Sequence, residues 1–172
     1  MKLKKAVVIV LWLGGFLSGH PSFAQKKNVK INWISFSALN DSLKANPKPV
    51  FVIFYADWCS LCKQMERSTF EDKRIVELLN RNYYAVKMNV ETKDTIIFGN
   101  QTFINKRIKK VNPIHDIALL MASRKNRPFS LPAIVLLDDK FIAKARYFQF
   151  LDAEAMDKIL LEMIRCSTIS LK

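Results

Sequence analysis

The chain has 172 residues, 50% of them hydrophobic, and carries 28 Lys and Arg against 15 Asp and Glu, for a formal charge of +13. Its basic residues are spread along the sequence without a nucleic-acid-binding motif, so nucleic acid is not expected as a partner. Three cysteines exclude the several disulfides that hold small secreted scaffolds together. A hydrophobic core must therefore stabilise the fold.

The first 24 residues have the features of a signal peptide. Three lysines precede an apolar stretch over residues 6–17, which is too short to span a bilayer reliably. Ser22-Phe23-Ala24 then places small residues at the two positions that signal peptidase reads. We expect cleavage near Ala24 and a periplasmic or secreted protein; an uncleaved membrane anchor is the alternative.

Cleavage there leaves 148 residues with a charge of +10, enough for one domain with its own core. We expect residues 25–35 to be a flexible N-terminal segment and residues 36–172 to be one folded domain. The excess of positive charge is consistent with solubility alone, or with contact to acidic proteins or a membrane surface.

The first half of the domain predicts helices and buried strands in alternation. Apolar residues at helical spacing predict a helix from Phe36 that two prolines end at residues 47 and 49. Residues 50–55 are apolar at every position, which is typical of a strand covered on both faces. A helix to about residue 67, a break over 68–71, a helix capped by Asp72 and a second buried strand over 83–90 follow.

The second half predicts further elements and an α/β sandwich. Residues 91–110 predict only loops and short turns, whereas Asn112-Pro113 predicts a helix cap and a proline at the first helical position. Strands over 131–137 and 141–148 and an amphipathic helix over 156–164 complete the order, with a basic loop at 124–127. This order predicts a mixed central sheet with helices on both faces.

Trp58-Cys59-Ser60-Leu61-Cys62 directly follows the first buried strand. The first cysteine lies in the last non-helical turn, where free backbone N–H groups and the helix dipole favour a thiolate. The second lies one helical turn further on, close enough for a small disulfide ring. The motif therefore predicts a dithiol/disulfide switch at Cys59 and Cys62.

Other uses of the cysteines fit the sequence less well. A zinc site needs four ligands, and beyond the motif the mature chain offers only Cys166 and His115, without paired spacing. Haem attachment needs His after the second cysteine, where Lys63 stands. We expect no metal and no cofactor. His115 is expected at the surface or as a helix cap, and Cys166 as a half-buried hydrophobe or in an intermolecular disulfide.

Over about residues 36–164 the chain resembles the thioredoxin family. The resemblance rests on Trp-Cys-x-x-Cys-Lys at 58–63, on Pro132 opening a strand about 70 residues later, and on the order of elements. It is most similar to the exported thioredoxin-related proteins of Bacteroidetes, through Thr69-Phe70-Glu71 and a helix near His115. The resemblance implies a three-layer sandwich with an extra helix inserted before the proline strand.

The resemblance also implies a role for each residue of the site. Cys59 matches the nucleophile that forms a mixed disulfide with substrate, and Cys62 matches the resolving thiol. Pro132 matches a cis-proline that faces the dithiol, and Leu131 offers backbone groups that pair with a substrate strand. Trp58 shields one side of the site, unless it simply fills the core.

Four positions depart from the family. Ile53 stands where the family has a buried carboxylate, so another base or water must accept the proton of the resolving thiol. Lys87, the lysine beside that carboxylate, is retained, either as an accessory residue or as a strand-edge lysine reaching solvent. Ser60-Leu61 replaces Gly-Pro between the cysteines and tunes the redox potential. Phe148-Gln149 replaces a glycine and reshapes the substrate groove.

These features predict an exported thiol–disulfide oxidoreductase that reduces or reshuffles disulfides of extracytoplasmic proteins. The apolar Leu131 favours a reductase, which needs electrons from a membrane partner that the sequence does not identify. We expect a monomer. The alternative is a protein-binding module that keeps the fold but has little redox chemistry. The two intact cysteines favour the enzyme, while the loss of the carboxylate keeps the alternative open.

Overall fold

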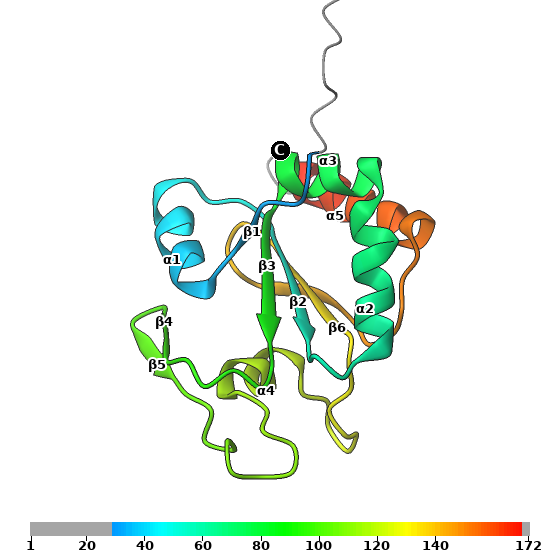
Figure 1. Ribbon diagram of the computed structural model, residues 1–172. Helices are drawn as coiled ribbons and strands as arrows, with labels where there is room; N and C mark the ends of the chain where they lie inside the picture. The colour runs from blue at the N-terminus through cyan, green and yellow to red at the C-terminus, as the bar shows by residue number, and fades with distance from the viewer. Residues whose placement is uncertain (1–28, 170–172) are drawn as a thin grey trace, which may run out of the picture.

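The computed structural model describes residues 29–169, with side chains described to residue 165. The predicted signal peptide lies outside the described residues. A five-stranded sheet of order β1-β3-β2-β6-β7 forms the centre (Figure 1). β1, β2 and β3 are parallel, whereas β6 and β7 run antiparallel to their neighbours. The strands are β1 (Trp33–Ile34), β2 (Val50–Tyr55), β3 (Tyr84–Asn89), β6 (Ala133–Leu137) and β7 (Ala143–Tyr147).

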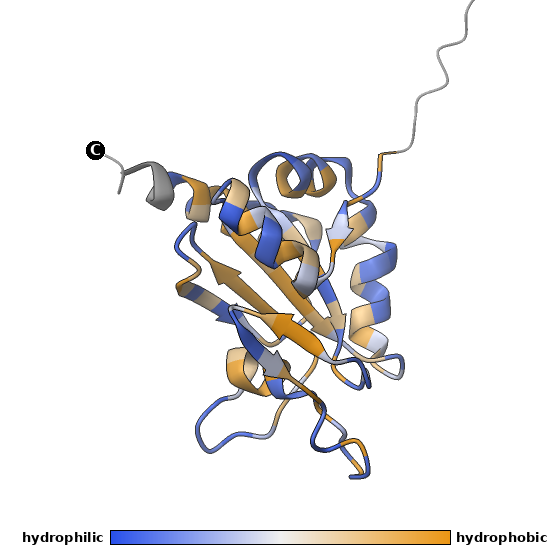
Figure 2. Cartoon of the chain, turned by 90° about the vertical axis from the view of Figure 1, so that its left-hand side faces the viewer, coloured by the Kyte–Doolittle hydropathy of each residue, from blue (hydrophilic) through white to orange (hydrophobic). Residues whose placement is uncertain are grey.

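Helices cover both faces of this sheet, as predicted. Side chains of β2 alternate between two cores: Phe51 and Ile53 lie in one, and Val52 and Phe54 in the other. The strands of the sheet are accordingly apolar along much of their length (Figure 2). The first core is covered by α2 (Ser60–Arg67), the short 3-10 helix η1 (Thr69–Glu71), α3 (Lys73–Asn82) and α5 (Ala153–Ile169), and the second by α1 (Phe36–Ala45) and α4 (Asp116–Ala122).

The structure confirms the three-layer α/β sandwich, including the helix α4 before β6. It also confirms the cap of α3, where the Asp72 carboxylate accepts the N–H groups of Arg74 at 2.9 Å and Ile75 at 3.3 Å. These bonds satisfy two of the backbone donors that a helix leaves free at its start. Among residues 29–169, no helix has the length and apolar character needed to cross a membrane.

Residues 31–34 are ordered parts of the fold, so the flexible segment predicted for 25–35 is wrong at this point. Trp33 and Ile34 pair with Ala85 and Val86 of β3. Ile31 is buried, and the Trp33 ring meets the Phe70 ring edge to face at a centroid distance of 5.3 Å. A strand of two residues is too short to show a periodic pattern, which explains why the sequence did not predict it.

A hairpin interrupts the region predicted as loops and turns. β4 (Ile96–Phe98) pairs with β5 (Gln101–Phe103) across Gly99 and Asn100, which both have positive φ angles of 58° and 61°. Such angles suit glycine and asparagine in a two-residue hairpin turn. The hairpin packs against α1, where the ring centroids of Phe98 and Phe36 lie 5.7 Å apart.

Helix α4 begins at Asp116 and not at Pro113, which corrects the predicted start. His115 is its N-cap, and the His115 Nδ1 accepts the N–H of Ile117 at 3.2 Å. The His115 backbone N–H donates to the carbonyl of Val90 at 2.8 Å. The chain just before α4 is therefore hydrogen-bonded to the residue that follows β3 and is not yet helical. Asn112 therefore does not cap the helix.

The last strand also begins later than predicted, at Ala143. Phe141 has a φ angle of 61°, which is incompatible with a strand and belongs to a tight turn. Asp138 organises this turn by accepting the N–H groups of Lys140 at 3.0 Å and Ile142 at 2.8 Å.

Candidate active site

Cys59 and Cys62 lie at the junction between β2 and α2 and form a disulfide. The sulfur atoms are 2.04 Å apart and the Cα atoms 5.3 Å, which confirms the predicted pairing. Cys59 is the N-cap of α2, and its Sγ accepts the N–H of Cys62 at 3.1 Å. When the bond is reduced, this N–H and the helix dipole favour negative charge on the Cys59 sulfur. Both residues are buried, with 4% and 5% exposed.

The spacer between the cysteines faces outward. Ser60 and Leu61 are exposed, and Leu61 keeps 43% of its surface accessible. The spacer is therefore the exposed part of a motif whose two cysteines are buried.

Trp58 is 66% exposed, so the interpretation that it fills the core is wrong. Its indole N–H donates to the Glu91 carboxylate at 2.8 Å. Glu91 lies in the turn just after the end of β3, the strand that neighbours β2 in the sheet. The carboxylate thus holds the indole beside the cysteines, a contact between distant segments that the sequence did not indicate.

The Leu131–Pro132 peptide bond is cis, as expected from the resemblance. Ala133, the first residue of β6, pairs with Phe54 near the end of β2, so Leu131 and Pro132 lie at the end of the sheet where the cysteine motif begins. Pro132 is buried and Leu131 half-buried. Within residues 29–169, the backbone N–H and C=O of Leu131 make no hydrogen bond, which leaves both groups free to pair with an added strand.

The position of the family's buried carboxylate is apolar here, and a different carboxylate lies nearby. Ile53 is buried and pairs in register with Lys87 of β3. Lys87 does not simply reach solvent: its Nζ lies 2.5 Å from Glu66 Oε2 of α2 and 4.8 Å from the centroid of the Tyr55 ring. The carboxylate that pairs with Lys87 therefore comes from helix α2, because Ile53 on the neighbouring strand has none.

Glu66 and Cys62 line one cavity of about 230 Å³ at the base of α2. The two residues are four apart, a spacing that places side chains on the same face of a helix. This spacing was the signal in the sequence that could have identified Glu66. The residues lining the cavity are Tyr55, Ala56, Asp57, Cys62, Lys63, Glu66 and Arg67.

Phe148, which stands near the replaced glycine, supports the loop that leads to Leu131. The guanidinium carbon of Arg124 lies 4.1 Å from the centroid of the Phe148 ring. Arg124 Nη2 also donates to Ser130 Oγ at 2.7 Å and to the Pro128 carbonyl at 3.3 Å. Phe148 therefore contacts the arginine that is hydrogen-bonded to this loop.

Two other residues of the sequence analysis, His115 and Cys166, belong to the start of α4 and to α5. His115 is fully buried, so the capping interpretation is confirmed and the surface interpretation is wrong. Its Nε2 lies 3.1 Å from the Asp94 carbonyl, and the Nδ1 acceptor role makes Nε2 the protonated nitrogen. Cys166 falls within α5, and its side chain lies outside the described residues.

Known proteins with similar sequences contain the same kind of domain. A family described as a thioredoxin-like domain matches residues 37–164. The thiol:disulfide interchange protein DsbD of Campylobacter jejuni (strain RM1221) is 31% identical over 156 residues, which cover 80% of this chain and 26% of that protein. DsbD of Escherichia coli (strain K12) is 31% identical over 139 residues, 78% of this chain and 19% of that protein. The chain spans about a quarter or less of these relatives.

Solved structures share the fold. A structure titled DsbH oxidoreductase superposes with a TM-score of 0.54 at 18% identity, covering 88% of this chain and 94% of that one. A thioredoxin from Thermus thermophilus superposes with a TM-score of 0.58 at 17% identity, covering 83% of this chain and 94% of that one. The names of the relatives agree with the disulfide oxidoreductase class that the dithiol predicts. With its family match over most of its length, the chain belongs to the thioredoxin-like domain family.

Proposed function

We propose that this protein is a thiol–disulfide oxidoreductase that acts outside the cytoplasm on disulfides of other proteins. The observation that carries the proposal is the Cys59–Cys62 disulfide at the start of α2. The exposed Trp58 and the unpaired backbone of Leu131 support it, because they give a substrate segment a surface and a strand edge beside the sulfur atoms.

In the proposed reaction the reduced protein transfers two electrons to a substrate disulfide. The Cys59 thiolate attacks one sulfur of the substrate, so a mixed disulfide forms and the other substrate sulfur leaves as a thiolate. Cys62 then loses its proton and attacks the Cys59 sulfur. This second step releases the remaining substrate thiol and regenerates the Cys59–Cys62 disulfide that the structure contains.

Glu66 is the proposed proton acceptor for Cys62. A base is needed because the thiolate and not the thiol is the nucleophile, and buried Ile53 offers none. Glu66 shares a cavity with Cys62, and the ion pair with Lys87 keeps the carboxylate on this face of the sheet. A proton can reach it directly or through solvent in the cavity.

The proposed direction is reduction, and the proposed location is the periplasm or the cell exterior. Each cycle leaves the protein oxidised, so a membrane-bound thiol donor must reduce it again. The relatives named thiol:disulfide interchange proteins support such a relay. We also retain, as a prediction, the grouping with exported thioredoxin-related proteins of Bacteroidetes. It rests on Thr69-Phe70-Glu71, which forms η1 and buries Thr69 and Phe70.

Equilibration with glutathione redox buffers tests this proposal. We expect a dithiol potential below about −180 mV, the value typical of protein disulfide isomerase, together with reduction of a disulfide-linked peptide by the pre-reduced protein. A potential clearly above that value would overturn the reductase direction. Failure to reduce any disulfide substrate would favour the binding-module alternative.

A further inference from the structure

A second cavity, of about 290 Å³, opens beside the cysteine motif at Trp58. Four segments build it: the junction between β2 and α2, the end of β3, the connection that leads to α4, and the loop before β6. Its lining combines apolar side chains with three polar residues and includes Leu131. The lining residues are Trp58, Val90, Glu91, Arg107, Asn112, Ile114, Pro128, Phe129 and Leu131.

The two loops that line this cavity are strongly basic. Residues 104–114 and 123–131 contain seven Lys and Arg and no Asp or Glu. Lys106 pairs with Asp116 at 3.2 Å, and Arg124 is occupied by the contacts to Phe148 and Ser130. The remaining five are exposed and make no ion pair with any described residue; we call them the cationic rim, Arg107, Lys109, Lys110, Lys125 and Arg127.

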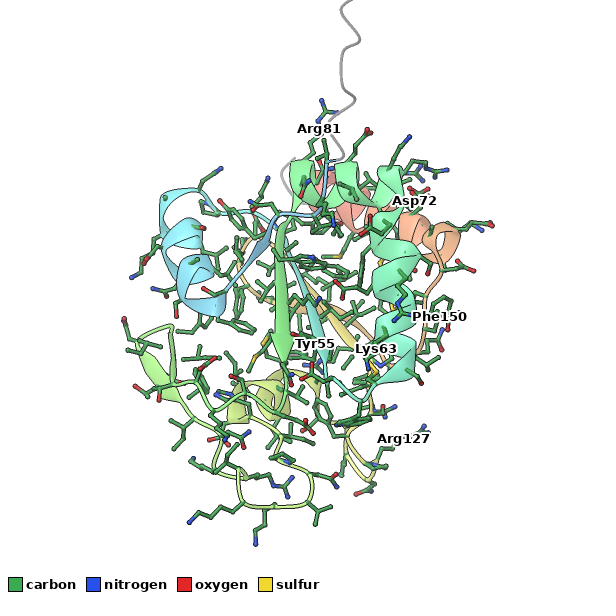
Figure 3. All side chains as sticks on the ribbon, in the orientation of Figure 1. Tyr55, Lys63, Asp72, Arg81, Arg127 and Phe150 are labelled. Carbon is green, nitrogen blue, oxygen red and sulfur yellow. A yellow bond between two sulfur atoms is a disulfide. The ribbon has the colours of Figure 1, made fainter. Side chains whose placement is uncertain are left out.

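The cationic rim lies at the same end of the molecule as the cysteine motif. Both loops extend from the end of the sheet where β2 and β3 have their carboxyl ends (Figure 1). Arg127 lies at that end, below Lys63 at the start of α2, whereas Arg81 on α3 lies at the opposite end (Figure 3). Removing the charge of Arg81 therefore serves as a control for removing charges of the rim.

We propose that the cavity and its cationic rim receive an acidic, extended segment of the substrate protein. This inference rests on the proposed function and specifies its substrate class. The segment would pair with the free backbone groups of Leu131, and one apolar side chain next to its cysteine would enter the cavity. Carboxylates along the segment would meet the rim, which raises the rate of encounter and selects against basic segments.

The observations favour a polypeptide over an anionic membrane as the partner. A membrane also attracts lysines, and Val111 beside the rim is 97% exposed. A bilayer, however, offers neither backbone groups for Leu131 nor a single side chain for the cavity. Arg107 of the rim also lines the concave site itself, which lies beside Trp58 of the cysteine motif and which a flat surface does not enter.

The test uses the full mature protein, pre-reduced, and peptides whose cysteine is joined to glutathione by a disulfide. Three peptides share a Leu next to the cysteine and differ only in their flanks, which are Glu, Gln or Lys. Stopped-flow fluorescence measures the second-order rate constant of reduction for each. We expect the Glu peptide to react about tenfold faster than the Lys peptide at low ionic strength. The ratio should fall toward one at about 1 M salt, where the Debye length is about 3 Å.

A variant with Arg107→Gln, Lys110→Gln and Arg127→Gln should lose most of the preference for the Glu peptide. Arg81→Gln, the matched control, should keep it. Replacing Leu by Ser in the Glu peptide should lower its rate several-fold, because the cavity loses its apolar occupant. Thermal unfolding of each variant shows whether a change in rate reflects the surface or the fold.

The outcomes separate this inference from the proposed function. Equal rates for the Glu and Lys peptides would overturn the acidic-segment inference and leave the oxidoreductase intact. If none of the peptides is reduced, the proposed function itself fails. If vesicles containing an anionic phospholipid bind the wild type but not the triple variant, and the peptides show no charge preference, the rim serves a membrane and the inference is wrong.

Discussion

Glu66 of α2 and Lys87 of β3 form an ion pair on the face of the sheet where Ile53 is buried. The pair adjoins the cavity that Cys62 lines. In the thioredoxin family the carboxylate at this place comes from the strand. Here Ile53 occupies the strand position in register with Lys87, and the carboxylate beside this lysine belongs to the helix that carries the cysteines.

Glu66→Gln should slow the second half of the reaction, the attack of Cys62 on the mixed disulfide. We expect a loss of about tenfold near neutral pH, because general bases contribute at least a hundredfold in enclosed sites and this one is partly exposed. Single-turnover release of the reduced peptide measures this step. The loss should shrink as the pH rises and solvent takes over the role of the base.

Glu77→Gln is the matched control for that experiment, since Glu77 is an exposed carboxylate on α3. It should release the peptide at the wild-type rate. If Glu66→Gln also keeps the wild-type rate across the pH range, the assignment of Glu66 as proton acceptor is wrong.

The Trp58–Glu91 hydrogen bond should matter for substrate encounter and little for stability. Glu91→Ala frees the indole, and we expect the rate of mixed-disulfide formation to fall about two- to fivefold, as for a net loss of about 1 kcal/mol. The free energy of unfolding should change by less than about 0.5 kcal/mol because the contact is exposed. Glu91→Gln retains an acceptor and should restore most of the rate. An unchanged rate in Glu91→Ala would show that the indole needs no such support.

Restoring the family's carboxylate at Ile53 should be costly. Ile53→Asp removes an apolar side chain from the core and buries a carboxylate, so we expect about 3 kcal/mol of destabilisation even with Lys87 nearby. Ile53→Val, the conservative control, should cost about 1 kcal/mol. Urea unfolding measures both. An Ile53→Asp variant as stable as wild type would show that the site had kept room for the acid.

Asp138 should make stability depend on pH in the acid range. Burial raises the pKa of its carboxyl, but the N–H groups of Ile142 and Lys140 and the ammonium of Lys144 outweigh burial and hold the pKa below its ordinary value. A pKa lowered by folding contributes stability above the unfolded pKa, near about 3.9, and this contribution is lost as the pH falls through the folded pKa.

Asp138→Asn should therefore be less stable than wild type at neutral pH, and the difference should begin to shrink near about pH 4 and disappear as the pH falls through the lowered pKa of the folded state. Asp139→Asn is the matched control, because Asp139 accepts no hydrogen bond from this turn within the described residues. Urea unfolding at a series of pH values provides the comparison. A difference that stays constant down to low pH would contradict this account.

The elements with strong periodicity or strong punctuation were predictable from sequence. β2 is apolar at every position, α3 has an aspartate cap and an amphipathic face, and the Cys-x-x-Cys motif fixes its own disulfide. Each of these depends on residues close together in the chain, where spacing translates directly into geometry.

The features that were missed depend on segments far apart in the sequence. β1 forms through the pairing of Trp33 and Ile34 with the edge of β3. Helix α4 begins after the predicted residue because the His115 N–H donates to the Val90 carbonyl. The β4–β5 hairpin is the exception, since its Gly99-Asn100 turn was a local signal that could have been used.

The active site divides in the same way. Cys59, Cys62 and Pro132 could be named from motifs that the family shares. Glu91 could not, because its partner Trp58 is 33 positions away and an exposed hydrogen bond leaves no pattern in the sequence.

Trapping the mixed disulfide tests the central claim most directly. Pre-reduced Cys62→Ser and Cys59→Ser variants are each incubated with the glutathione-linked peptide and analysed by intact-mass spectrometry. The account predicts that Cys62→Ser accumulates one covalent adduct at Cys59, because the resolving thiol is absent, and that Cys59→Ser forms none at Cys62. No adduct in Cys62→Ser, or an equal adduct in both variants, would contradict the assignment of Cys59 as nucleophile and Cys62 as resolving thiol.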